Sequence, residues 1–106
     1  MESITASELK ALMDERADVQ LIDVRQPDEY AFANIKGAKL IPLGEIISRM
    51  KEIDPNRDTV IHCKMGGRSA RAIEALQQYG YTGRLRNLAG GITAWSNEVD
   101  PTVPKY

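Results

Sequence analysis

Cysteine and histidine are scarce in this chain, which has one of each, Cys63 and His62. A lone cysteine excludes an internal disulfide framework and fits a reducing compartment. One cysteine and one histidine also make no credible metal site. The formal net charge is −1 at pH 7, so the chain as a whole has no electrostatic case for binding nucleic acid or an anionic membrane.

Long apolar runs are absent as well. No segment approaches the ~20 apolar residues that span a bilayer. The N-terminus has no basic region followed by an apolar run, so it does not read as a signal peptide. We therefore expect a cytoplasmic protein with no membrane partner. The 106 residues, 42% hydrophobic and 27% charged, predict one globular domain over residues 1–106.

Helical and extended patterns alternate along the chain. Thr5 and Glu8 form a capping-box pattern that opens a helix ending near residues 14–16. Further helices are expected over residues 27–33, 43–53, 69–79 and 92–98, and strands over 19–24, 38–41, 58–62 and 85–88. The tail, residues 102–106, is expected to be short and extended. Strands that alternate with helices predict an α/β fold with a mainly parallel sheet.

The stretch around Cys63 carries the chemistry. An apolar strand pattern leads into the cysteine, and Gly66, Gly67 and Arg68 follow before a helix that Ser69 is expected to cap. The glycines allow positive φ, so the backbone amides of the loop can form a nest for an anion. The start of the helix adds its own unpaired N–H groups. A cysteine in such a loop has a lowered pKa and a reactive thiolate. The alternative is a cysteine that only fills space in the core, but such a position would need neither the glycines nor the cations that follow Cys63.

Three polar residues lie next to this stretch or at the end of another strand. Asp23 and Arg25 end the 19–24 strand, at the same sheet edge as Cys63 if the strands are parallel. Arg25 either braces the active loop or pairs with Glu29 or Asp28 at the surface. His62 adjoins Cys63, but neighbours on a strand point to opposite faces. We therefore expect a core or interface histidine and not a general base.

Four segments resemble the sequence signatures of rhodanese-type sulfurtransferases. They are residues 63–69 (Cys-Lys-Met-Gly-Gly-Arg-Ser), 21–25 with Glu29 and Tyr30, 37–42, and 87–95. This chain departs from the family at Ala33-Asn34, where many members have Gly-His. We expect these two positions to have a structural role, so the difference does not affect the expected activity. The resemblance implies a rhodanese-like α/β fold, with a central five-stranded, mainly parallel sheet and helices on both faces. Gly90-Gly91 is a second flexible turn, which we expect near the active loop.

The resemblance also implies an activity and a set of site residues. Cys63 would be the nucleophile that carries sulfur as a persulfide. The loop that holds the persulfide would be Lys64, Met65, Gly66, Gly67 and Arg68, with Lys64 and Arg68 as candidates for binding a donor's negative charge. Asp23, Arg25 and Ser69 would support the site. The donor would be thiosulfate or a cysteine-desulfurase persulfide, and no cofactor is implied.

Other functions stay open on the sequence alone. The C-terminal run resembles rhodanese domains fused behind E1-like adenylating enzymes of molybdopterin (molybdenum cofactor) or thiamine biosynthesis. In that case the chain would be an excised sulfur-relay domain whose acceptor is a ubiquitin-like sulfur carrier protein. A cysteine phosphatase or arsenate reductase is disfavoured, because its pattern places arginine at position 69, where this chain has serine. A redox-sensing thiol is a further alternative.

Overall fold

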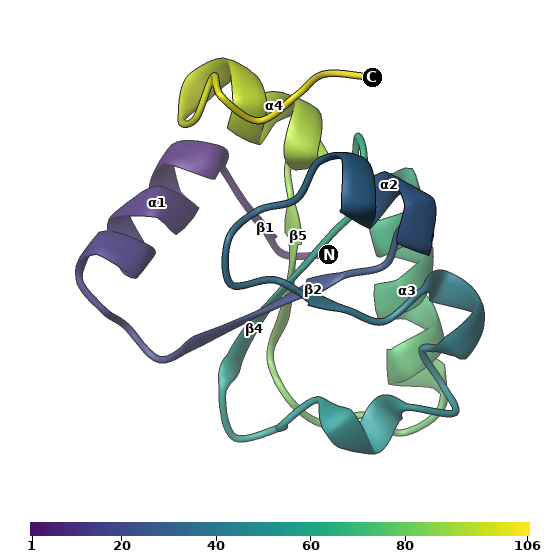
Figure 1. The fold of residues 1–106 in the computed structure, drawn as a ribbon. Helices are drawn as coiled ribbons and strands as arrows, with labels where there is room; N and C mark the ends of the chain where they lie inside the picture. The colour runs from purple at the N-terminus through teal and green to yellow at the C-terminus, as the bar shows by residue number, and fades with distance from the viewer.

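The computed structural model describes all 106 residues, and a five-stranded sheet forms its centre (Figure 1). The strands are β1 (Ser3–Ile4), β2 (Val19–Asp23), β3 (Lys39–Leu40), β4 (Asp58–His62) and β5 (Leu85–Leu88). Their spatial order is β1-β5-β4-β2-β3, and every neighbouring pair is parallel. The predicted α/β class with a parallel sheet is therefore confirmed. The strand β4, which leads to Cys63, is the central strand.

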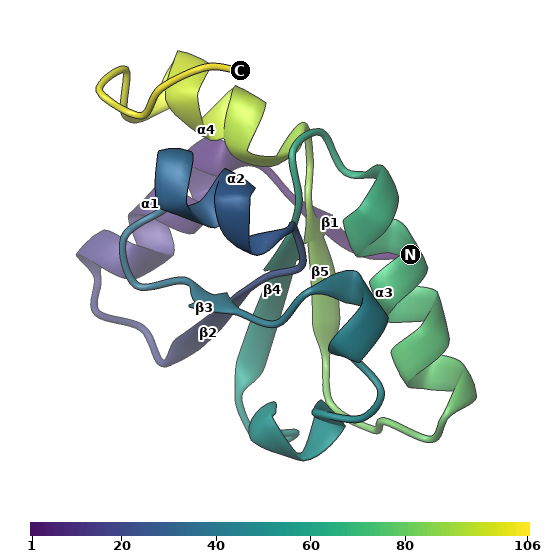
Figure 2. The ribbon, with the colours of Figure 1, turned by 45° about the vertical axis from the view of Figure 1, so that its right-hand side comes forward.

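Helices cover both faces of the sheet. They are α1 (Ala6–Asp14), α2 (Pro27–Phe32), α3 (Gly67–Gln78) and α4 (Gly91–Glu98). Figures 1 and 2 show α1 and α4 together on one side of the sheet and α3 on the other. None of these helices has the length and apolar character that crossing a bilayer requires.

Two separate apolar clusters fill the space between the sheet and its helices. Leu21 and Val60 pack on the side of α1 and α4, where Trp95 lies buried. The next residue of each strand, Ile22 and Ile61, packs on the side of α3. This alternation follows from the period of two along a strand. It explains why strands buried on both faces read as continuous apolar runs.

The N-terminal helix forms as its sequence predicts. The Thr5 hydroxyl accepts a hydrogen bond from the Glu8 amide at 3.1 Å, and the Glu8 carboxylate accepts one from the Thr5 amide at 2.9 Å. This confirms the capping box. The 58–62 and 85–88 strands are also confirmed with these bounds. The two-residue β1 completes the sheet but was not expected, because so short a strand has no alternating pattern to read.

The prediction of a helix over residues 43–53 is wrong. This segment forms two short 3₁₀ helices, η1 (Leu43–Glu45) and η2 (Met50–Glu52). Gly44 and the β-branched Ile46 lower the helix propensity of the segment. Ile46 and Ile53 are nevertheless buried against the sheet. The apolar spacing therefore predicts correctly which residues are buried. It does not predict the backbone conformation, which is 3₁₀ and irregular instead of α-helical.

The start of α3 also differs from the prediction. The helix begins at Gly67, and its N-cap is Gly66 with φ of +118°. Ser69 is therefore not the N-cap but a residue of the first helical turn. The left-handed turn at Gly66, which favours glycine, lets the helix begin two residues earlier than its apolar pattern suggests. At the other end Gly80 has φ of +88°, as expected for a residue that terminates a helix.

Candidate active site

The Cys63 thiol lies directly after β4, at the carboxyl edge of the sheet, and is 2% exposed. Its Sγ accepts a hydrogen bond from the Gly66 amide at 3.0 Å. The Ser69 hydroxyl lies 3.4 Å from the same sulfur. The β4–α3 loop therefore turns polar groups toward a thiol that is shielded from solvent.

These contacts decide the protonation state of the thiol. Burial raises the pKa of Cys63, because it disfavours the charged thiolate. Hydrogen bonds from the Ser69 hydroxyl and from the amides of Ser69, Gly66 and Met65 lower it, and together they prevail. The net direction is a lowered pKa, which favours the nucleophilic thiolate.

Ser69 links the thiol to the neighbouring strand. Its Oγ lies 2.6 Å from Asn87 Oδ1 and 3.1 Å from the Gly66 carbonyl oxygen. The Asn87 side-chain Nδ2 also donates to the Gly66 carbonyl at 3.1 Å. The single hydroxyl proton can serve only one acceptor at a time, so an ionised sulfur competes for it with Asn87. The sequence does not single out Asn87 as a site residue, although its place near the carboxyl end of a strand beside β4 is an available signal.

Arg25 is a buried structural cation. Its Nη2 donates to Asp23 Oδ2 at 2.7 Å and to the Ala33 carbonyl at 2.6 Å, and both charged side chains are fully buried. Its Nη1 donates to the Tyr106 hydroxyl at 2.8 Å. The alternative of a surface charge paired with Glu29 or Asp28 is therefore wrong. Arg25 and Asp23 form an internal pair, and Arg25 holds the C-terminal end of α2 through the Ala33 carbonyl.

His62 lies in the core, as predicted. The ring Nδ1 is 3.2 Å from the Cys63 carbonyl oxygen, and Nε2 is 3.7 Å from Asp23 Oδ2. Burial lowers the pKa of His62, with the Asp23 carboxylate partly opposing it. The ring contacts the backbone of Cys63 and is hydrogen-bonded to no atom of the thiol. His62 is therefore not placed as a general base for the sulfur.

The two cations of the loop have different partners. Arg68 forms a bidentate pair with Glu29, with N–O distances of 2.6 and 2.9 Å. This pair lowers the pKa of Glu29 to about 2 and raises that of Arg68. The Lys64 ammonium instead lies 4.6 Å from the centre of the Tyr106 ring. Met65, between them, is 67% exposed.

The Gly90-Gly91 turn packs against the backbone of Cys63, as expected. The first amides of α4 reach the loop: Ile92 N donates to the Cys63 carbonyl at 3.0 Å, and Thr93 N to the Lys64 carbonyl at 3.1 Å. Gly91 has φ of +58°, and a Cβ there would lie 2.3 Å from the Lys64 carbonyl oxygen. Only glycine allows this approach.

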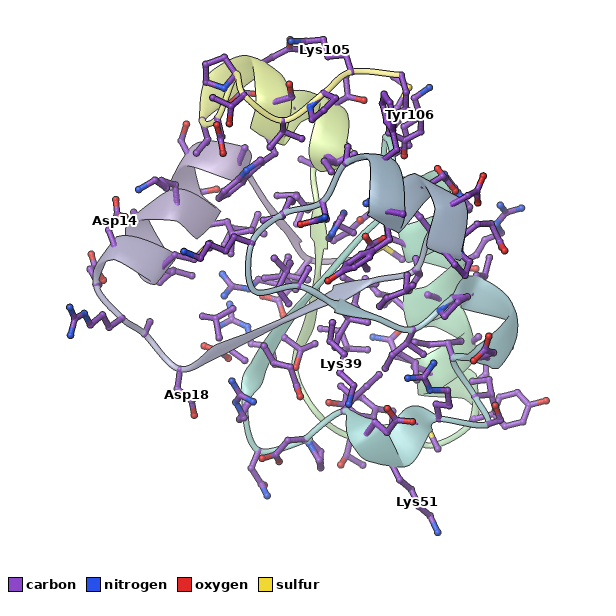
Figure 3. All side chains as sticks on the ribbon, in the orientation of Figure 1. Asp14, Asp18, Lys39, Lys51, Lys105 and Tyr106 are labelled. Atoms are coloured by element: carbon purple, nitrogen blue, oxygen red, sulfur yellow. The ribbon has the colours of Figure 1, made fainter.

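Tyr106 contacts the site, which the sequence does not predict. The tail was expected to be merely short and extended, but it brings this ring onto α2, as Figure 3 shows. The Tyr106 hydroxyl donates to Glu29 at 2.7 Å and accepts from Arg25. No local pattern signals a contact made across 77 residues.

Other features of the molecule lie outside this site. No group of three or more His, Cys, Asp or Glu side chains is arranged to hold a metal ion. A mostly apolar surface groove lies against α1 and β2 and contains none of the loop residues. It is lined by Leu9, Met13, Ala17, Val19, Leu21, Lys36 and Gly37.

The fold and the thiol define an α/β protein with a shielded, activated cysteine at the end of its central strand. The chain belongs to the family of rhodanese-like domains, whose sequence model matches residues 5–98. The structure is similar to that of a rhodanese-like domain protein from Staphylococcus aureus, with a TM-score of 0.84 and 37% identity. That similarity covers 93% of this chain and 95% of the other.

Relatives of known sequence give the same assignment. The chain is 41% identical to a sulfurtransferase of Allochromatium vinosum, over 97% of this chain and 95% of the relative. It is 36% identical to the chloroplastic rhodanese-like/PpiC domain-containing protein 12 of Arabidopsis thaliana over its full length, but spans only 38% of that protein. It is 37% identical, over 98% of its length, to the probable adenylyltransferase/sulfurtransferase MoeZ of Mycobacterium tuberculosis, of which it spans 27%. Family and relatives support sulfur transfer as the general activity.

Proposed function

We propose that Cys63 carries sulfur as a persulfide between an anionic donor and a nucleophilic acceptor. The observation that carries this proposal is the Gly66 amide, which donates to Sγ at 3.0 Å in a site where the pKa of the thiol is lowered. Such a site stabilises negative charge on sulfur, which both a thiolate and a persulfide anion carry.

The first half-reaction loads the cysteine. The Cys63 thiolate attacks the outer sulfur of thiosulfate, a new S–S bond forms, and the S–S bond of the donor breaks. The electron pair of the broken bond leaves on sulfite, and the enzyme retains one sulfur with one negative charge. In the second half-reaction a nucleophile such as cyanide takes the terminal sulfur as thiocyanate and restores the thiolate. Charge and atoms balance in both steps, and neither step needs a cofactor.

The loop residues divide the work between them. The amides of Met65 and Gly66 hold the charge on sulfur, and Gly66, in a left-handed conformation, is the N-cap of α3. Gly67 begins the helix that follows. Arg68 braces the loop through Glu29, so Lys64 is the loop cation left to bind the donor's charge.

The supporting residues act on this loop from outside it. Ser69 contacts the sulfur directly, at 3.4 Å. Arg25, paired with Asp23, donates to the carbonyl oxygens of Glu29 and Ala33, and the Glu29 carboxylate in turn holds Arg68.

Similarity to MoeZ favours a second role, that of a sulfur-relay domain. The donor would then be a protein-bound persulfide, such as that of a cysteine desulfurase. The acceptor would be the adenylated C-terminus of a ubiquitin-like carrier. The terminal sulfur of the Cys63 persulfide would displace AMP, and a thiol reductant would cleave the resulting acyl disulfide to a thiocarboxylate. The role of Cys63 is the same in both proposals.

The structure argues against phosphoryl chemistry at this thiol. A phosphatase needs an arginine free to bind the transferred oxyanion. Here the nearest arginine in sequence, Arg68, is held by both oxygens of Glu29. Only Lys64, Met65 and Gly66 separate the cysteine from α3, which leaves a short loop suited to one sulfur atom.

Intact mass spectrometry tests the persulfide. Thiosulfate is expected to add one sulfur atom, and cyanide to remove it as thiocyanate. Cys63→Ser should take up none, and unfolding curves should show that this variant is folded. If thiosulfate adds nothing, a desulfurase-generated persulfide is offered instead, and uptake then supports the relay role. Failure with both donors contradicts the proposal.

A further inference from the structure

Tyr106 joins the active loop to α2 through contacts made by both its hydroxyl and its ring. The hydroxyl accepts from Arg25 at 2.8 Å and donates to Glu29 at 2.7 Å. The ring face lies 4.6 Å from the Lys64 ammonium, and Phe32 packs against the ring edge-on at 6.0 Å between centroids. These hydrogen bonds and ring contacts fix the orientation of a side chain that is still 41% exposed.

Lys64 differs from the other cations of the site. Arg25 is paired with Asp23, and Arg68 with Glu29. Lys64 forms no ion pair and has only the ring of Tyr106 as a partner. A cation held on a ring keeps its full charge, whereas one paired with a carboxylate is neutralised. The net positive charge next to Cys63 in the chain is therefore that of Lys64.

We propose that Tyr106 is a specificity-determining residue, which positions Lys64 so that the site prefers dianionic sulfur donors over monoanionic ones. This inference rests on the proposed function, since it concerns the donor that loads Cys63. A free lysine side chain loses considerable rotamer entropy when it binds. The ring and its two hydrogen bonds restrict Lys64 beforehand, so less of that entropy is lost when the donor arrives.

Two donors that differ in charge test the inference. Both thiosulfate (a dianion) and methanethiosulfonate (a monoanion) present an outer sulfur to the thiolate. Single-turnover loading of Cys63 is measured by quenched intact-mass spectrometry over a range of donor concentrations. Each series gives a half-saturating concentration and a limiting rate. The chains compared are wild type, Tyr106→Leu, Lys64→Gln, the double variant, and Tyr79→Leu as a control at an exposed tyrosine of the α3 C-cap.

The expected effect falls on donor binding. Tyr106→Leu raises the half-saturating concentration of thiosulfate by roughly two- to fivefold, the value of a cation–ring contact at a partly exposed site. Lys64→Gln raises it by roughly tenfold or more, since a hydrogen bond to a charged group is lost. The limiting rate changes little in both. For methanethiosulfonate each change is about half as large on a logarithmic scale, because the attraction scales with donor charge.

The double variant separates positioning from general bracing. If Tyr106 acts through Lys64, removing the ring has little further effect once Lys64 is gone. A positioning role therefore requires non-additive changes, and unchanged behaviour of Tyr79→Leu. Additive changes, equal effects on both donors, or a fall in limiting rate alone overturn the inference. If wild type loads from neither donor, the inference fails as well, and a desulfurase-generated persulfide then decides whether persulfide formation at Cys63 itself survives.

Discussion

Gly91→Ala tests the packing that positions the active loop. A Cβ at this position would lie 2.3 Å from the Lys64 carbonyl oxygen and 2.5 Å from that of Cys63. Both oxygens accept hydrogen bonds from the start of α4, so neither can move without breaking one. The substitution therefore combines an unfavourable positive φ with a backbone collision.

A matched control, Gly37→Ala, separates the cost of the positive φ from the cost of the backbone collision. Gly37 also has positive φ, +91°, but a Cβ there meets nothing within 4 Å. Gly37→Ala should cost only the conformational strain, roughly 1–2 kcal/mol. Gly91→Ala should cost the same strain plus roughly 1–3 kcal/mol for the collision. A difference of about 1 kcal/mol lowers the melting temperature of a domain of this size by roughly 4 °C or more.

Urea unfolding and persulfide loading measure the two consequences. The free energy of unfolding should fall further for Gly91→Ala than for Gly37→Ala. Under conditions where both variants are folded, only Gly91→Ala should load sulfur slowly, because the displaced carbonyls belong to Cys63 and Lys64. Equal destabilisation together with wild-type loading in Gly91→Ala would refute the reasoning.

Three further predictions concern titrating groups. Ser69→Ala removes a hydrogen bond that lowers the pKa of Cys63, so alkylation by iodoacetamide should shift to higher pH and slow by roughly fivefold near neutrality. The pKa of Glu29 falls from 4.5 in its ordinary state to about 2 in the fold, so the stability from its ion pair is full above pH 4.5 and is lost as the pH falls toward 2. Urea unfolding at about pH 5 and about pH 3 should therefore differ less in Glu29→Gln than in wild type. Burial lowers the pKa of His62 below 6.5, so the unfolded chain takes up the proton first, and between about pH 6.5 and 5 the unfolding free energy should drop further in wild type than in His62→Asn.

The features predicted correctly from the sequence are those with a local pattern. The apolar run before Cys63 is the central strand, and two glycines and a helix follow it in the expected order. The place of Arg25 at a strand end was enough to bring it to the active edge, since parallel strands end together. The 43–53 segment failed because apolar spacing reports burial, and a 3₁₀ path can satisfy the same spacing as an α-helix.

The features that were missed depend on pairs of residues distant in the chain. Arg68 meets Glu29 across 39 residues, and Tyr106 meets Glu29 across 77. Nothing in the sequence near Arg68 shows that its charge is already taken, so Lys64 and Arg68 appeared equivalent as donor-binding cations. The fold distinguishes them, because it places a carboxylate beside one and an aromatic ring beside the other.

This division of partners separates two electrostatic tasks in the site. The groups that contact the sulfur are neutral: the Gly66 amide at 3.0 Å and the Ser69 hydroxyl at 3.4 Å. Both hydrogen-bond donors are held in place by α3 and by Asn87, which contacts Ser69 and Gly66. Because the site is shielded from water, their hydrogen bonds to the sulfur are stronger than they would be in solvent. The guanidinium of Arg68 is paired with Glu29, which braces the loop, while its charge also interacts with Cys63. In the proposed mechanism the net charge of the loop is that of Lys64, which forms no ion pair and acts on an arriving donor, where salt screens it. The proposal therefore assigns stabilisation of the thiolate and selection of the donor to different residues, so that each could change without the other.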